Sequence, residues 1–304
     1  MQGITPHLWY DTEAVEAARL YCETFPDSRV TGTAMLPGTP SGDAGMVTFE
    51  LFGQPFMAIS AGPHFRFTPA VSFMVTCETA DEVDRYWNRL SPGGSVLMEL
   101  GSYPFSERYG WTTDRYGLSW QISLAADGDV GEVGSQRVTP SLLFVGDVCG
   151  QAGEAIGLYT SVFDDAGIYA AAPYGPDAAP NAPDDLMHAR FRLAGQQFVA
   201  MDSALGHDFG FNEAVSFLVE CEDQEELDRY TEALSAVPEA EQCGWLKDRY
   251  GLFWQVHPVE MSRMMLEGSA EQIARVTEAF LAMKRLDLAA LRRAYEGEVS
   301  SATT

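Results

Sequence analysis

The chain of 304 residues contains the same text twice. Residues Ala70–Glu78 recur with few changes as Ala214–Glu222, and residues Gly110–Ile122 recur as Gly244–Val256. A repeat this long indicates two duplicated domains rather than a solenoid of short units. The first pair of segments is separated by 144 residues and the second pair by 134, so the second copy lacks ten residues that the first contains.

The repeat sets the predicted domain boundaries. We predict one domain over residues 1–123 and a second over residues 138–258. They are joined at residues 124–137 by a linker rich in Gly and Asp, which offers little to bury.

A helical extension is predicted to follow at residues 259–297, before a disordered tail at 298–304. Ser269–Gln272 matches a capping box, and Asp287 can cap a second helix that Gly297 stops. We expect the two helices to clamp the globular body, with a partner-docking role as the alternative.

Within each copy, the hydrophobic pattern predicts a strand, a helix and then three strands, and this unit occurs twice. In the first copy, Ile4–Tyr10 begins one unit and Val71–Cys77 begins the next. The segments Gly38–Gly45 and Tyr174–Asp185, rich in Pro, Gly and Asp, are expected to be either mobile loops that border a cleft or simply loops. The predicted fold class is α+β, with four βαβββ units forming cupped mixed sheets.

Charge and composition argue against several classes of partner. There are 19 Lys and Arg residues against 44 Asp and Glu, a formal net charge of −25 that disfavours nucleic acid and anionic membranes. No run of about 18 apolar residues could span a bilayer. The N-terminus also lacks the features of a signal peptide.

Five cysteines without a CxxC pair are expected to be reduced thiols of a cytoplasmic protein, and two lysines among many arginines suggest a bacterial source.

Several motifs occur in both copies and together resemble one family. They are a helix ending in Tyr-x-x-x-Phe, a strand reading Ala-Val-Ser-Phe, and the pattern Gly-Trp…Asp-x-Tyr-Gly-x-x-Trp-Gln. Over nearly all of residues 1–297 the chain resembles PhnB-like proteins of the glyoxalase and bleomycin-resistance (vicinal oxygen chelate) superfamily. The resemblance implies two tandem glyoxalase-like domains. Because single-copy relatives dimerise, it also implies an intramolecular pseudo-dimer with a large apolar interface between the copies, present as a monomer or a homodimer.

Many members of this family carry the label 3-demethylubiquinone 3-methyltransferase. The sequence argues against that activity, because Gly128–Gly134 lacks the GxGxxG spacing and falls in the linker rather than at a strand-to-helix turn.

The resemblance also implies where a metal ion would be held. Metal-using members of the superfamily supply His or Glu from the first, fifth and last strands of a cupped sheet. The first strands of the two copies carry His7 and Ser141 at this place, and the last strands carry Gln121 and Gln255. Because amide and hydroxyl oxygens are poor ligands for transition metals, we predict no bound metal and no cofactor.

Four further histidines (His64, His188, His207 and His257) lie outside these places, and a lone histidine is more often structural than a ligand. If the two copies exchange units, however, His7 could meet residues of the other half, which the sequence leaves open.

The tryptophans differ in their predicted roles. Alternation along a strand places Trp9 on the face of His7, whereas Trp120 and Trp254 face the helices and are core residues. Leu143 stands in place of Trp9 in the second copy, so the two clefts are not lined alike. Asp114 and Asp248 are expected to hold turns with their side chains.

These observations favour a protein that binds a small organic molecule without a tightly bound metal. The predicted ligand-binding residues are His7, Trp9, Gln121, Ser141 and Gln255, with one aromatic-lined cleft in the first copy near His7, Trp9 and Gln121. A sequestering or resistance role is one form of this hypothesis, by resemblance. The competing hypotheses are a metal-dependent lyase, isomerase or dioxygenase, and an assembly module whose cups are filled by side chains. The sequence does not decide whether the protein is an enzyme.

Overall fold

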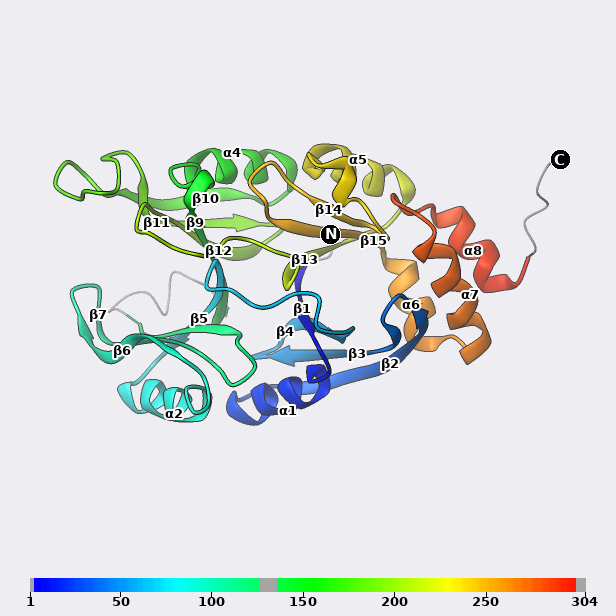
Figure 1. Cartoon of the computed structure of the whole chain (residues 1–304), viewed down its shortest axis with the longest axis horizontal. Helices are drawn as coiled ribbons and strands as arrows, with labels where there is room; N and C mark the ends of the chain where they lie inside the picture. Colours follow the sequence, from blue (N-terminus) through cyan, green and yellow to red (C-terminus); the bar gives the residue numbers. More distant parts are fainter. Residues whose placement is uncertain (1–2, 126–135, 299–304) are drawn as a thin grey trace.

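The structure, a computed structural model, describes residues 3–125 and 136–298. Most of the predicted linker (126–135) and of the predicted tail (299–304) lies outside the described residues. The two copies form two stacked halves, the first coloured blue to cyan and the second green to yellow (Figure 1). The C-terminal helices, in orange and red, lie along one side of both halves.

The first copy contains two βαβββ units, as predicted. They comprise β1 (Ile4–Tyr10), α1 (Ala14–Thr24), β2 (Arg29–Thr39), β3 (Gly42–Leu51) and β4 (Gln54–Ser60), then β5 (Val71–Cys77), α2 (Ala80–Leu90), β6 (Val96–Tyr103), β7 (Ser106–Thr113) and β8 (Ser119–Leu124). The expected loop at residues 38–45 is wrong, because β2 and β3 continue into it and form a tight hairpin. Gly38 and Gly42 allow this turn, with φ of +70° and +92°.

The second copy repeats the first unit but shortens the last one. Its elements are β9 (Val138–Val145), η1 (Gly146–Val148), α4 (Ala152–Val162), β10 (Gly167–Pro173), β11 (Leu186–Leu193) and β12 (Gln196–Ser203), then β13 (Val215–Cys221), α5 (Gln224–Leu234), η2 (Pro238–Ala240), β14 (Trp245–Lys247) and β15 (Phe253–Pro258). The fourth unit is therefore βαββ and not the predicted βαβββ. The ten missing residues remove the counterpart of β6.

Each sheet is shared between the two copies. Sheet A has seven strands in the order β14-β15-β13-β1-β4-β3-β2, and sheet B has eight in the order β10-β11-β12-β9-β5-β8-β7-β6. The copies meet where the first strand of a unit in one copy pairs antiparallel with the first strand of a unit in the other, β1 with β13 and β5 with β9. The first unit of copy one therefore shares sheet A with the last unit of copy two, the arrangement that the sequence left open.

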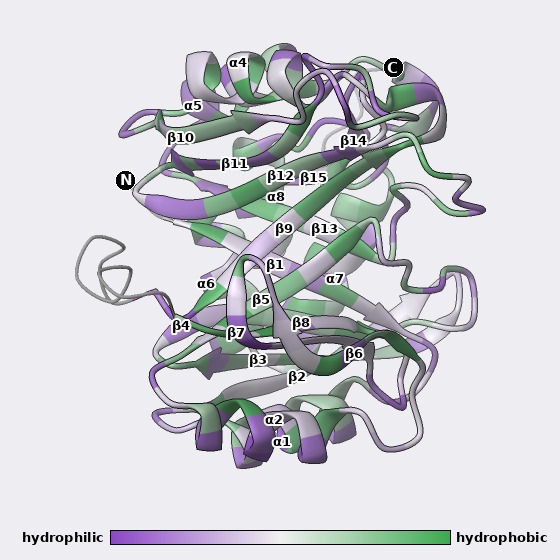
Figure 2. Cartoon of the chain, turned by 90° about the vertical axis from the view of Figure 1, so that its left-hand side faces the viewer, coloured by the Kyte–Doolittle hydropathy of each residue, from purple (hydrophilic) through white to green (hydrophobic). Residues whose placement is uncertain are grey.

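The helices of the repeats lie outside the sheets. Helices α1 and α2 cover one end of the molecule and α4 and α5 the opposite end, with their hydrophilic surfaces turned outward (Figure 2). The outer faces of the sheets pack against these helices and hold the core. Trp120 and Trp254 are fully buried there, which confirms their prediction as core residues.

A buried carboxylate organises the first copy. In the β7–β8 turn, Asp114 Oδ1 accepts hydrogen bonds from the backbone N–H of Tyr116 and Leu118, at 2.8 and 3.1 Å. Its Oδ2 accepts from the Tyr21 hydroxyl at 2.6 Å and from the Trp120 indole at 2.9 Å. Tyr21 lies on α1, which packs on sheet A, whereas the turn belongs to sheet B. Asp114 thus ties together two units that contribute to different sheets.

Asp248 repeats this arrangement in the second copy. It accepts from the backbone of Tyr250 and Leu252 and from the side chains of Tyr159 and Trp254. Both aspartates hold their turns as the sequence predicts.

The C-terminal extension contains three helices, α6 (Val259–Glu267), α7 (Ala270–Leu281) and α8 (Leu288–Glu296). The caps at Ser269, Asp287 and Gly297 are confirmed, but the sequence analysis missed α6. After α7 the chain pairs with the segment before β14, where the N–H groups of Cys243 and Gly244 donate to the carbonyls of Met283 and Lys284 at 2.8 and 2.9 Å. The extension therefore lies beside the edge where the second copy lacks a strand.

No helix within the described parts of the chain is long and apolar enough to cross a membrane.

Removing one hydroxyl donor from a buried aspartate should destabilise the protein. We expect Tyr21→Phe and Tyr159→Phe each to lower the free energy of unfolding by about 2 kcal/mol, because each leaves a buried carboxylate with one donor fewer. Tyr116→Phe is the matched control, since its hydroxyl bonds to Glu16 at an exposed position. Urea unfolding of the three variants measures the effect, and equal stability of Tyr21→Phe and Tyr116→Phe would contradict this role for Asp114.

Candidate functional site

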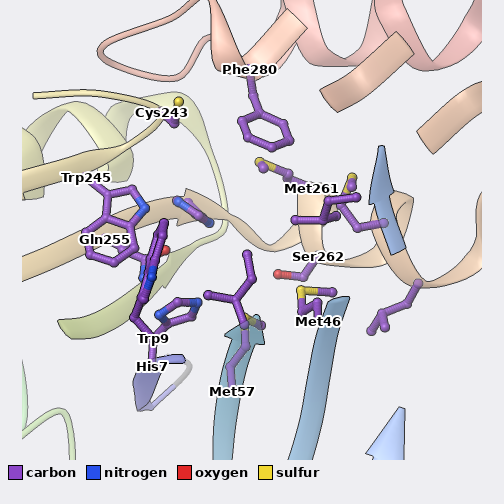
Figure 3. A pocket seen from close by; sticks show the side chains of 15 residues that line it. His7, Trp9, Met46, Met57, Cys243, Trp245, Gln255, Met261, Ser262 and Phe280 are labelled. Atoms are coloured by element: carbon purple, nitrogen blue, oxygen red, sulfur yellow. The ribbon is translucent and has the colours of Figure 1, made fainter. Parts of the chain in front are cut away.

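The inner face of sheet A, opposite α1 and α5, carries the candidate site. Strand β1 contributes His7 and Trp9, and their register partners on β4 are Met57 and Ile59. Strand β15 contributes Gln255 from the other copy. The imidazole of His7 and the indoles of Trp9 and Trp245 gather on one side, with Met46, Met261 and Ser262 on the other (Figure 3).

These side chains enclose a cavity with two connected chambers. The inner chamber has a volume of about 110 Å³ and the outer chamber about 400 Å³. The two chambers share six lining residues: Trp9, Leu36, Ile59, Cys243, Trp245 and Phe280. Together they reach the size at which ligand pockets usually begin, roughly 300 Å³.

The C-terminal helices cover the inner chamber. Helix α6 contributes Met261, Met265 and Leu266, and α7 contributes Phe280. Helices α6 and α7 also pack on β2, at the far edge of sheet A from β14. The extension therefore bridges the two edges of the sheet above the cavity.

Two histidines, one from each copy, line the inner chamber, and each has one ring nitrogen without a hydrogen-bond partner. His7 Nδ1 and His257 Nε2 are fully buried, and no described residue pairs with either atom. Burial, together with the nearby His257, lowers the pKa of His7 to about 3. Burial also lowers the pKa of His257 to about 4. Both rings are therefore uncharged at neutral pH.

A glycine makes room for His257. Gly244 has φ of +82°, and a Cβ atom there would lie 2.8 Å from Cδ2 of His257 and 2.9 Å from the carbonyl oxygen of Val256. The preceding Cys243 also has a positive φ, of 56°. This left-handed pair, next to the shortened last unit, lets the imidazole lie directly against the backbone.

The inner face of sheet B has the same framework but satisfies its polar groups internally. Gln121 Oε1 accepts from the Tyr109 hydroxyl at 2.8 Å, and its Nε2 donates to Ser72 at 2.7 Å and to Ser141 at 3.3 Å. All four residues are buried. At this place sheet B therefore carries a closed hydrogen-bond network.

Sheet A has only part of this network, because several of its residues differ between the copies. Gln255 Nε2 still donates to Ser216, at 2.9 Å. The repeat alignment, however, puts Cys243 in the place of Tyr109, His7 in the place of Ser141 and His257 in the place of Ser123. Among the described residues, no donor reaches Gln255 Oε1.

The structure brings together three of the five predicted ligand-binding residues. His7, Trp9 and Gln255 line one cavity, whereas Gln121 and Ser141 lie together in sheet B. The predicted cleft of His7, Trp9 and Gln121 within the first copy is therefore wrong. The physical reason is the pairing of β1 with β13, which joins His7 to the last unit of the second copy.

The sequence analysis did not include Trp245 and His257 among the ligand-binding residues. A signal for His257 was present, since it lies two residues after Gln255 on the same strand and so shares its face. The methionines from α6 could not be anticipated, because this helix was not predicted.

The donor set of the cavity does not fit the metal that the superfamily implies. On the three strands concerned, the residues are His7 on β1, Ser216 on β13 and Gln255 on β15, which gives one imidazole, one hydroxyl and one amide. Across the described residues, no group of three or more His, Cys, Asp or Glu side chains could hold a metal ion. His257 adds one imidazole and no anionic donor.

Comparison with known proteins identifies relatives of both copies. The family model described as 3-demethylubiquinone-9 3-methyltransferase matches residues 2–123 and again residues 136–257. The PhnB protein from Bacillus cereus is 40% identical over 41% of this chain and 100% of its own, with a TM-score of 0.38. Glyoxalase I from Zea mays is 10% identical over 83% of this chain and 92% of its own, with a TM-score of 0.51, and shares the fold. None of the curated proteins matches the chain.

The buried His7 should make the protein sensitive to mild acid. Its folded pKa of about 3 lies below the value near 6.5 of the unfolded chain, so stability is lost as pH falls from about 6.5 toward 3. Between pH 7 and pH 5, we expect the free energy of unfolding of His7→Phe to fall by roughly 2 kcal/mol less than that of the wild type.

Urea unfolding at the two pH values measures the difference. His64→Phe, at an exposed position, is the control and should keep the wild-type pH dependence. An unchanged pH dependence in His7→Phe would show that His7 is charged in the folded protein.

Proposed function

Because the chain belongs to the 3-demethylubiquinone-9 3-methyltransferase family and shares the glyoxalase fold, we propose that it binds a small organic molecule in the cavity of sheet A without a tightly bound metal. The ligand lies between His7, Trp9 and Gln255, under the roof formed by α6 and α7. Gln121 and Ser141, which the sequence predicted as ligand-binding residues, bond to each other in sheet B and in this proposal do not touch the ligand.

One observation carries the proposal, namely that two of the residues lining the cavity, His7 and His257, each keep a buried imidazole nitrogen unpaired. An unsatisfied buried polar atom costs about 1–3 kcal/mol, and a ligand that supplies the partner regains part of that cost. In sheet B the counterpart Ser141 accepts from Gln121 and the counterpart Ser123 bonds to Ser106, so neither is left unpaired. Only the arrangement in sheet A therefore favours a ligand.

The same histidines are poorly suited to proton transfer. A general base works best when its pKa lies near the working pH, and these pKa values are about 3 and about 4. A binding or sequestering role therefore fits the site better than acid–base catalysis. The methyl transfer in the family's description is not part of the proposal, since the sequence has no glycine-rich turn between a strand and a helix.

A metal-dependent lyase, isomerase or dioxygenase is the competing function. It would require at least three His, Asp or Glu donors converging on one point. His7 and His257 supply two imidazoles, and Gln255 stands where relatives of that kind would carry a carboxylate. No observation at the site favours this alternative.

Three broader features belong to the same proposal. A division into domains at 1–123 and 138–258 with a linker at 124–137 is part of the proposal, and the two matches of the family model, at 2–123 and 136–257, support it. All five cysteines are free thiols, in keeping with a cytoplasmic, bacterial protein. The pairing of β1 with β13 and of β5 with β9 supports an intramolecular pseudo-dimer, present as a monomer or a homodimer.

A neutral apolar dye tests the proposed cavity. We expect Nile red to bind one site per chain with increased fluorescence, and Ile59→Trp to abolish binding by filling both chambers. Met201→Trp is the matched control, because Met201 is the counterpart of Ile59 and lies in sheet B. Absence of binding, or loss of binding in Met201→Trp alone, would overturn the assignment of the cavity.

A further inference from the structure

The two chambers of the cavity differ in the side chains that only one of them contacts. The outer chamber alone is lined by the rings of His64, Phe65 and Phe253. The inner chamber alone is lined by four methionines, from β3, β4 and α6 (Met46, Met57, Met261 and Met265). A methionine side chain is flexible and fills irregular space, whereas an aromatic ring offers a flat and rigid surface. The chambers therefore suit different parts of one molecule.

The inner chamber is too small for a ring. An apolar cavity of about 150 Å³ holds one benzene molecule, whereas the inner chamber has a volume of about 110 Å³. At roughly 30 Å³ for each non-hydrogen atom, the share of one water molecule in the liquid, it holds about four such atoms. By the same comparison with benzene, the outer chamber, of about 400 Å³, has room for a system of about two fused rings.

The rings around Trp9 form flat walls at right angles to one another. The indole N–H of Trp9 donates to the carbonyl oxygen of Gly62 at 2.8 Å, which holds this ring in place. Phe65 and Trp245 stand edge-on to it, with ring centroids 5.0 and 6.2 Å away and interplanar angles of 79° and 75°. A flat aromatic molecule can place its face on one such wall and its edge on the next, which are the contacts that aromatic rings prefer.

The exposed residues of the lining mark the mouth of the cavity. Ser41, His64 and Gln242 line the outer chamber and are exposed to solvent. Ser41 Oγ and His64 Nε2 lie 3.0 Å apart. Among the described residues that line the inner chamber, only Leu266, on the roof helix α6, is exposed. A ligand that enters from the outer chamber therefore brings one end to the methionines.

Binding in this cavity depends on apolar burial and shape rather than on charge. No Lys, Arg, Asp or Glu of the described residues lines the inner chamber, and Glu213 alone lines the outer one. The Ser262 hydroxyl at the inner chamber already donates to Glu220, at 2.5 Å. The fit of each part of a ligand to its chamber should therefore decide the affinity.

We propose that the ligand is a flat aromatic molecule whose rings lie in the outer chamber and whose inner end is one compact substituent of about four non-hydrogen atoms or fewer. The rings lie against Trp9 and Trp245, and the substituent lies among the methionines under α6. The chamber restricts the size of this substituent and leaves its polarity open. This inference rests on the proposed binding function and specifies the ligand class for that site.

Neutral 2-naphthamides that differ in their 6-substituent test the ligand class by displacement of Nile red. Two fused rings match the outer chamber, and the carboxamide can stay at the polar mouth while the 6-substituent reaches the inner chamber. We expect the 6-propyl compound to bind wild-type protein about tenfold more tightly than the 6-phenyl compound, because a phenyl group stays outside the inner chamber and leaves it unfilled. The fully saturated analogue of the 6-propyl compound should bind about fivefold more weakly, because it loses the contacts between aromatic rings.

Enlarging the inner chamber should remove the preference for the small substituent. Met57→Ala shortens a side chain that lines this chamber alone, so the 6-phenyl compound should bind this variant at least as tightly as the 6-propyl compound. Met201→Ala is the matched control, because Met201 lies on β12, the strand of sheet B that corresponds to β4. It should keep the wild-type order.

The outcomes distinguish this inference from the proposed function. Equal or tighter binding of the 6-phenyl compound to wild-type protein, or an unchanged order in folded Met57→Ala, overturns the compact inner end. Equal or tighter binding of the saturated analogue overturns the aromatic body. These results leave the binding function standing, whereas failure of Nile red and all the naphthamides to bind overturns both proposals. The comparisons on wild-type protein are decisive even if Met57→Ala does not fold.

Discussion

Backbone pairing between β1 and β13 determines which side chains of this protein can meet. A strand edge with free N–H and C=O groups needs a partner, and here the first strand of a unit in one copy pairs with the first strand of a unit in the other copy. The register places His7 opposite Ser216 and so brings it to the strand that carries Gln255 and His257. The candidate site is thus built by both copies, although each copy has its own buried aspartate.

Few changes are needed to make one face of a duplicated protein different from the other. The glutamine on the last strand is kept in both sheets, as is the serine that accepts its amide N–H. Tyr109 and Ser141, which complete the network in sheet B, are replaced by Cys243 and His7 in sheet A, and the neighbouring Ser123 is replaced by His257. At the same place the second copy loses ten residues, and the C-terminal extension covers the exposed side. The loss of hydrogen-bond partners and the covering C-terminal helices together leave a chamber without charged lining residues.

Much of this fold could be predicted from the sequence. The repeat predicted the duplication, and period-two alternation predicted the strands. The capping residues Ser269 and Asp287 predicted two of the three terminal helices. The repeated text around Asp114 and Asp248 predicted the hairpin turns correctly. These features depend on interactions between residues that are close together in the sequence.

The composition of the site could not be predicted in the same way. Alternation places His7 and Trp9 on one face, but it does not say which unit lies across the cup. That choice depends on pairing between strands more than 200 residues apart, such as Ile4 with Val219. The roof was missed for a related reason, because α6 follows β15 directly after Pro258 with no side-chain cap to mark its start.

A long-range 1H–15N NMR spectrum of the histidine side chains tests the central claim most directly. The account predicts that His7 and His257 are both neutral at pH 5.5. It further predicts that Nile red shifts the signals of His7 and His257 and leaves that of His188, in sheet B, unchanged. A charged His257 at this pH, or a response confined to His188, would contradict the placement of an uncharged ligand site in sheet A.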